Sequence, residues 1–280
     1  MKQPFLLSRP RLQRVSRGAN LHFHLNDTLY RFDALILVWY KSTMKLIIIL
    51  LLSFNFLACQ NTPSSNINAS SIVAGGKPVY LSSELYEDIK AQISDYPQKG
   101  SAAQSVDEFV LRKLQKSRTE KDCERANSEV MTNLQNFYGK PYGSLDEKQI
   151  NILIPLFDQL RADAGFYIGQ IKRNYNRTRP YDYLKDLAPC IPTEKSLSYP
   201  SGHSILAVLY ALVLSDLFPD KSIQFKDRAE VIAQDRVLAG VHHPSDIVGG
   251  KKMGQILYDE VIKSPRYKND IEKYKKLLIE

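Results

Sequence analysis

The sequence predicts an all-α fold, a compact multi-helix bundle around a central apolar helix. Ten uninterrupted apolar residues run from Ile205 to Leu214, which suits a buried core helix and is too short for a membrane span. Elsewhere apolar residues recur three and four apart, and no convincing alternation typical of strands is seen. A chain of 280 residues that is 44% hydrophobic and 24% charged can bury such a core.

The predicted helices follow one another along the second half of the chain. They begin at about residue 103 and continue over 119–138, 145–179, the apolar helix from Ser204, 223–240, 244–263 and the charged tail from 264. The run over 145–179 must end near Arg179, because Pro180 disfavours the helical conformation of the residue before it.

Most of the positive charge lies at the start of the chain. The formal net charge is +8, and residues 1–43 carry seven Lys and Arg against two Asp, which is 7 − 2 = +5. Lys45 adds one, so the rest of the chain holds 8 − 5 − 1 = +2. A basic surface for nucleic acid is therefore not supported, and no nucleic-acid partner is expected.

An export signal is predicted at residues 44–58. Met44 and Lys45 precede "LIIILLLSFNFLAC", an apolar stretch that ends at Ala58 and Cys59, an order typical of a signal peptide. The "FLAC" ending resembles a bacterial lipoprotein signal, in which Cys59 would carry the lipid. An ordinary signal peptide or an N-terminal anchor helix is the alternative.

The chain is accordingly divided into a doubtful N-terminal extension (1–43), the signal (44–58), a polar tether (59–78) and the helical domain (79–280). This division predicts an exported, periplasmic protein that is tethered to a bacterial membrane. If Cys59 is lipidated, Cys123 and Cys190 remain either as a disulfide pair or as two buried thiols.

The first of three motifs is Lys172-x6-Arg179-Pro180. The spacing places both cations on one face of the helix that is expected to end at Arg179. By itself this pattern is also typical of solvated charges at a helix C-terminus.

The second motif is "YPSGHS" at 199–204, directly before the apolar helix. The amides of Ser201, Gly202 and His203 are expected to point outward at a helix N-terminus, where an anion is favoured. Ser201 is equally well interpreted as a plain helix N-cap.

The third motif is Arg236-x5-His242-x3-Asp246. Pro244 suits the first position of a helix, so Asp246 is expected in the first turn, where it can cap the helix and accept a hydrogen bond from His242. That bond would fix one tautomer and free the other ring nitrogen to act as a base, a ligand or a nucleophile. Taken alone, the motif favours a capping Asp beside an exposed histidine.

Together the motifs supply what a phosphoryl group needs: cations and N–H donors for its equatorial oxygens, a nucleophile and an acid for the leaving oxygen. The candidate residues are Lys172, Arg179, Ser201, Gly202, His203, Arg236, His242 and Asp246. Because side chains supply the positive charge, neither a metal nor a cofactor is expected.

In this order, the three motifs resemble the signature of the type 2 phosphatidic acid phosphatase superfamily, which also includes the vanadium haloperoxidases. Within it, the chain is most similar to the class A bacterial nonspecific acid phosphatases. The likeness covers about residues 97–263 and includes "RADAGFYIGQIKRNYNRTRP" at 161–180 and "SYPSGH" at 198–203.

The resemblance implies a metal-independent acid phosphatase that hydrolyses small phosphate monoesters through a phosphohistidine. His242 would attack phosphorus while Asp246 holds its other nitrogen, and His203 would protonate the leaving alkoxide. The phosphate would be held by Lys172, Arg179 and Arg236, assisted by Ser201 and Gly202. The resemblance also suggests a homo-oligomer and a preference for mildly acidic solution.

Three other functions stay open: a lipid-phosphate phosphatase, a vanadate-dependent haloperoxidase and a noncatalytic phosphate-binding lipoprotein. Two positions also depart from the family pattern. Asp235 stands where serine is usual, and its carboxylate either weakens phosphate binding or points away from the site. His243 stands where tryptophan is common and is expected to affect substrate preference.

Overall fold

The computed structural model describes residues 77–280, which belong to one compact unit spanning Ile67–Glu280. The predicted extension, signal and lipidation site at Cys59, and nearly all of the tether, lie outside the described residues. Between residues 77 and 280 the secondary structure is helical, apart from one isolated bridge between Gly139 and Leu145. The all-α prediction is confirmed. None of the helices in this part of the chain is both long enough and apolar enough to span a membrane.

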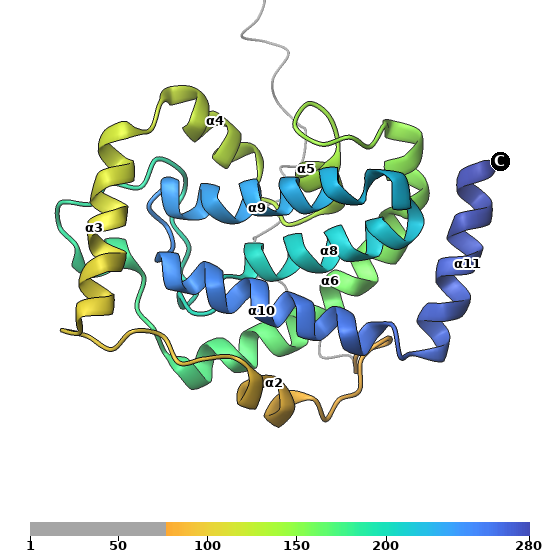
Figure 1. Ribbon diagram of the computed structural model, residues 1–280, viewed down its shortest axis with the longest axis horizontal. Coiled ribbons are helices and arrows are strands. Elements are labelled where there is room, and N and C mark those ends of the chain that lie inside the picture. Colours follow the sequence, from red (N-terminus) through yellow and green to blue (C-terminus); the bar gives the residue numbers. More distant parts are fainter. Residues whose placement is uncertain (1–76) are drawn as a thin grey trace, which may run out of the picture. The chain divides into compact units, whose positions relative to one another are not determined.

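The helices, in chain order, are α2 (Tyr86–Gln92), α3 (Ala102–Ser117), α4 (Glu120–Ser128), α5 (Leu134–Tyr138), α6 (Glu147–Tyr175), α7 (Pro180–Tyr183), α8 (Gly202–Leu217), the 3-10 turn η1 (Pro219–Lys221), α9 (Ser222–Leu238), α10 (Pro244–Val261) and α11 (Pro265–Ile279). In Figure 1, α3 and α4 stand at one end of the bundle and α11 at the other.

The apolar helix α8 lies in the middle of the bundle, between α9 and α10 and against α6 (Figure 1). Eight of the ten side chains between Ile205 and Leu214 are buried, as the apolar run predicts. Helix α10 approaches α8 closely, because a Cβ at Gly250 would lie 2.7 Å from Ser201 O and one at Gly254 would lie 2.6 Å from Ile205 O. The contact moves four residues forward on α10 and four residues forward on α8, so the two helices run parallel. Their N-termini, which carry the second and third motifs, therefore meet.

Two predicted helices differ from the structure. The helix expected over 119–138 is two helices, α4 and α5, because the Asn133 side chain accepts a hydrogen bond from Asn136 N and starts a new helix. The long helix α6 ends at Tyr175, not at Arg179. Asn176 takes the left-handed conformation there, with φ 51°, which ends a helix.

Arg179 consequently has an extended backbone and is the N-cap of α7, whose first residue is Pro180. The expectation that Lys172 and Arg179 share one helix face is therefore wrong. The chain turns between them, and Arg179 approaches the site from a loop while Lys172 approaches from the last turn of α6.

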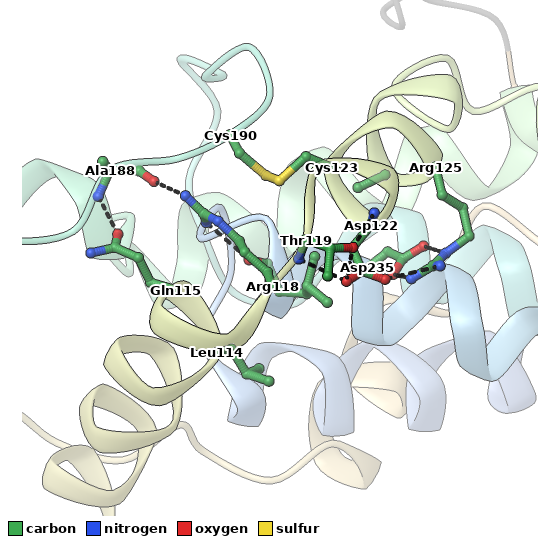
Figure 2. The surroundings of a disulfide bond; sticks show 12 residues. Leu114, Gln115, Arg118, Thr119, Asp122, Cys123, Arg125, Ala188, Cys190 and Asp235 are labelled. Atoms are coloured by element: carbon green, nitrogen blue, oxygen red, sulfur yellow. Dashed lines mark hydrogen bonds and ion pairs between the residues drawn. A yellow bond between two sulfur atoms is a disulfide. The ribbon is translucent and has the colours of Figure 1, made fainter. Parts of the chain in front are cut away.

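The loop between α7 and α8 is fastened to the α3–α4 corner (Figure 2). Cys123 of α4 forms a disulfide with Cys190 of the loop, which decides between the two alternatives left by the sequence. Arg118 adds hydrogen bonds to Ala188 O at 2.5 Å and to Leu238 O at 3.0 Å. These contacts hold the segment that leads into the second motif.

Candidate active site

His242 and Asp246 meet where the chain enters α10. His242 Nδ1 lies 3.1 Å from Asp246 Oδ2, and both side chains are buried. On the other side of the ring, Nε2 lies 3.0 Å from an Arg179 guanidinium nitrogen. Arginine can only donate, so Nε2 is the acceptor and the ring proton belongs on Nδ1, toward the carboxylate. The arrangement selects the tautomer whose Nε2 carries a lone pair.

Burial and then the charge of Arg179 hold the pKa of His242 well below its usual value, although the bond to Asp246 opposes them. Burial by itself would raise the pKa of Asp246, but hydrogen bonds from His242 and His243 keep this pKa well below its ordinary value. The pair is therefore a neutral imidazole beside a carboxylate.

Asp246 also has two partners from the segment between α6 and α8, and they were not predicted from the sequence. Arg177 donates to its Oδ1 at 2.7 Å, and Ser198 donates to its Oδ2 at 2.5 Å. Arg177 is buried and also pairs with Asp107 of α3 at 3.0 Å. The sequence indicates a role for Arg177 only through its position two residues before Arg179 in "NRTRP". Its partner Asp107 is 70 residues away, so no local pattern connects the two.

Lys172 and Arg179 supply buried positive charge beside the histidine. Lys172 donates through Nζ to Leu197 O, and burial followed by the charge of Arg179 lowers its pKa to about 7. Arg179 also bonds to the backbone oxygens of Ser196 and Val241, each at 2.8 Å. Both cations are thus aimed by carbonyl groups of the loops around them.

Arg236 is directed by a second buried carboxylate. One guanidinium nitrogen donates to Ala126 O and to Glu129 Oε2, both at 2.6 Å, and Glu129 also pairs with Arg228 at 2.8 Å. The Nε atom of Arg236 is buried and has no hydrogen-bond partner among the described residues. Its charge acts on His203, since burial and then Arg236 lower the pKa of that histidine to about 3.

Asp235 points away from this site. Its carboxylate accepts two hydrogen bonds from Arg125 of α4, each at 2.7 Å, as Figure 2 shows. Adjacent residues of α9 face different neighbours, so Asp235 binds Arg125 while Arg236 binds Glu129. The sequence left open whether this carboxylate weakens phosphate binding or points away from the site, and it points away.

The second motif lies at the start of α8, with one difference from expectation. Ser201 is the N-cap, and its side chain accepts from Ser204 N at 3.3 Å. Its own amide donates to Asp246 O at 3.0 Å. The prediction that this amide points outward is therefore wrong, because the close approach of α10 uses it. His203, on the first turn of α8, is buried, with Nδ1 3.9 Å from Glu194 Oε1.

His243 lies behind Asp246. Its ring is buried, Nδ1 lies 3.1 Å from Asp246 Oδ2, and Nε2 lies 3.0 Å from the Tyr183 hydroxyl. Adjacent histidines thus share one carboxylate oxygen, but only His242 reaches Arg179. Among residues 77–280, no group of three or more His, Cys, Asp and Glu side chains is placed to hold a metal ion.

The fold and the site together are an all-α bundle whose three motifs bring cations, an imidazole and a carboxylate into contact. One segment of the chain, residues 162–268, matches the family model described as the PAP2 superfamily. It contains all eight residues that were predicted for the site.

Two curated proteins and one solved structure are similar to this chain. A non-specific acid phosphatase of Salmonella typhimurium is 32% identical over 129 residues, 44% of this chain and 51% of that protein. A lipid A 1-phosphatase of Rhizobium johnstonii is 32% identical over 95 residues, 32% of this chain and 39% of that protein. The crystal structure of a transmembrane PAP2 type phosphatidylglycerolphosphate phosphatase from Bacillus subtilis is 23% identical, covers 64% of this chain and 91% of its own, and has a TM-score of 0.41. The chain spans about half the length of the acid phosphatase that it matches.

Proposed function

We propose that the protein is a metal-independent acid phosphatase that hydrolyses phosphate monoesters through a phosphohistidine on His242. The observation that carries this proposal is the position of His242 between Arg179 and Asp246, at 3.0 Å and 3.1 Å. A group held by Arg179 would lie against the Nε2 lone pair, while Asp246 stabilises the imidazolium that forms during attack.

In the first step, the Nε2 lone pair of His242 forms a bond to phosphorus as the bond to the leaving oxygen breaks. His203 gives a proton to that oxygen, which leaves as an alcohol. In the second step, His203 takes a proton from water, the water oxygen attacks phosphorus, and the P–N bond breaks to release phosphate. Lys172, Arg179 and Arg236 neutralise the charge on the phosphoryl oxygens.

A preference for acid follows from the pKa values of Lys172 and of the substrate. The Lys172 pKa of about 7 means that its positive charge is present below pH 7 and lost above it. The His203 pKa of about 3 means that this histidine is neutral in the empty site at mildly acidic pH. A monoester has a second pKa of about 6, so below that pH the substrate itself can bring the proton that His203 passes on.

The test is hydrolysis of p-nitrophenyl phosphate by the full chain across pH, with and without a chelator. We expect activity that survives chelation and disappears in His242→Ala, and acid quenching should trap phosphate on His242. Phosphate trapped only on serine would refute the mechanism. Halide oxidation that depends on added vanadate, in the absence of hydrolysis, would favour the haloperoxidase.

A lipid-phosphate substrate is the second candidate, favoured by the similarity to a lipid A 1-phosphatase. Export to the periplasm and a membrane tether at Cys59 are part of the proposal, and they would place the domain beside such lipids. The Cys123–Cys190 disulfide supports an oxidising compartment. Comparing the hydrolysis of a soluble monoester with that of a phosphorylated lipid in mixed micelles separates the two substrate classes. Incorporation of radiolabelled palmitate that is lost in Cys59→Ala tests the tether.

A homo-oligomer is proposed on the family resemblance alone, and sedimentation velocity tests it.

A further inference from the structure

The loop between α7 and α8 places an acidic side chain among the cations of the site. Glu194 Oε2 accepts a hydrogen bond from Arg179 at 2.8 Å, and Glu194 Oε1 lies 3.9 Å from His203 Nδ1. Burial would raise the pKa of Glu194, but the basic groups around it, Arg179 among them, hold this pKa well below its usual range. A carboxylate anion therefore lies where the proposed function requires a phosphoryl group.

All the hydrogen-bond donors of Arg179 are already used. A guanidinium group has five N–H bonds, and the five contacts of Arg179 match them. They go to Ser196 O (2.8 Å), Val241 O (2.8 Å), His242 Nε2 (3.0 Å), Glu194 Oε2 (2.8 Å) and Ser196 Oγ (2.8 Å). A phosphate oxygen can gain a hydrogen bond from Arg179 only by displacing one of these partners.

Glu194 is the partner most easily displaced. Its side chain is 39% exposed, whereas that of Arg179 is 2% exposed. The backbone of Glu194 is held in place by the Tyr181 hydroxyl group. This hydroxyl donates to the Glu194 carbonyl oxygen at 2.6 Å and accepts from the Glu194 amide at 3.1 Å. Displacement therefore needs only a rotation of the side chain toward solvent, with the loop unchanged.

Charge favours the same exchange. A bound phosphate brings negative charge next to the Glu194 carboxylate, and two anions that share Arg179 repel each other at short range. Ser196 would be freed as well, because its hydroxyl now donates to Glu194 Oε2 at 2.9 Å. Glu194 thus offsets the charge of Arg179 as an internal anion, and a phosphate that binds Arg179 would have to replace it.

We propose that the Glu194 carboxylate is an internal occupant of the phosphate site, which phosphate displaces and which thereby weakens the binding of phosphate and phosphate monoesters. The proposal rests on the proposed function only in taking Arg179 as a phosphate-binding residue. Its consequence for an enzyme is faster release of product phosphate, because the carboxylate returns to Arg179 as phosphate leaves.

The test is inorganic phosphate binding to the full chain at pH 6, measured by isothermal titration calorimetry without any substrate. Glu194→Gln keeps the size of the side chain and removes its charge, and Glu194→Ala removes the carboxylate altogether. Both variants remove the charge-assisted hydrogen bond that phosphate has to displace, and a tenfold change in Kd corresponds to about 1.4 kcal/mol. We therefore expect phosphate to bind about tenfold more tightly to both variants.

The matched control is Glu230→Gln on α9, which removes the same charge from an exposed pair with Lys251 at 2.8 Å. Its Kd for phosphate should stay within about twofold of wild type. Tightening of threefold or more in both Glu194 variants supports the proposal. A smaller change, or weaker binding, in either variant overturns it and assigns Glu194 to positioning Arg179.

The outcome is separable from that of the proposed function. If the wild type hydrolyses monoesters and the Glu194 variants bind phosphate no more tightly, the internal occupant is refuted and the phosphatase stands. If the Glu194 variants bind phosphate more tightly and the wild type hydrolyses no monoester, the internal occupant stands and the phosphatase is refuted. No phosphate binding in any form would refute both.

Discussion

Replacing Asp235 with asparagine should lower the stability of the fold and leave the proposed chemistry nearly unchanged. The Asp235 carboxylate is 2% exposed and takes both hydrogen bonds of the Arg125 fork, each at 2.7 Å. The asparagine would keep the size of the side chain but lose the charge and one acceptor oxygen. The contact that is lost joins α4 to α9, next to the disulfide (Figure 2).

The size of the loss follows from the exposure of the two partners. Breaking a buried ion pair by removing one partner costs about 3–5 kcal/mol, because the other charge stays buried. Arg125 is 27% exposed, so water can partly replace the lost carboxylate and the cost falls to about 2–3 kcal/mol. At about 2–4 °C per kcal/mol for a domain of roughly 150–250 residues, Tm should fall by about 5–10 °C.

The measurements are urea and thermal denaturation of the wild type, Asp235→Asn, Arg125→Met and the double variant. The double variant should lose about 1–2 kcal/mol less stability than the sum of the two single losses, and this difference is the coupling energy of the pair. The kcat/KM for p-nitrophenyl phosphate should stay within about threefold of wild type. A stability loss below about 0.5 kcal/mol, or a tenfold rise in kcat/KM, would show that the carboxylate acts on the phosphate site instead.

Three further perturbations test other parts of the structure. Cys123→Ser opens a disulfide that joins residues 67 apart and should lower the free energy of unfolding by about 3–4 kcal/mol; urea denaturation that matches wild type would mean that the bond does not form. Phosphate affinity should fall above pH 7, as Lys172, with its lowered pKa of about 7, loses its proton; calorimetry should also show proton uptake on binding near pH 8, and a pH-independent Kd from 6 to 9 contradicts this. His243→Ala should keep at least a tenth of the activity, a barrier increase of no more than about 1.4 kcal/mol, because Asp246 still binds Arg177 and Ser198; a loss equal to that of His242→Ala would reassign the nucleophile.

Local patterns in the sequence were sufficient for the core helix α8, for the start of α10 and for the third motif. The apolar run of α8 identified the core helix, and Pro244 identified the start of α10, where Asp246 both caps the helix and binds His242. The side chain of the third residue of a helix can reach back to the residues just before the helix, whatever the rest of the chain does. The spacing of His242 and Asp246 was therefore enough to predict their contact.

Backbone conformation between elements was predicted less well. Pro180 showed that a helix had to end before it, but the end lies at Asn176 because that residue takes a left-handed conformation. The Ser201 amide is used by Asp246 O because Gly250 lets α10 approach α8. Neither the left-handed turn nor the helix contact has a local pattern that would have revealed it.

By itself, the sequence determined that the described part of the chain is helical and that its cations, histidines and carboxylate belong to one set of motifs, since these properties depend on composition and short spacing. Only the tertiary structure decided how the charges are paired. Arg177 binds Asp107, Arg236 binds Glu129 and Asp235 binds Arg125, across separations of 70, 107 and 110 residues. Such pairs depend on which helices pack together, and many acidic and basic residues of the sequence are equally plausible partners until packing buries a few of them. The position of Glu194 at Arg179 was decided in the same way, by the loop that the disulfide holds against α4.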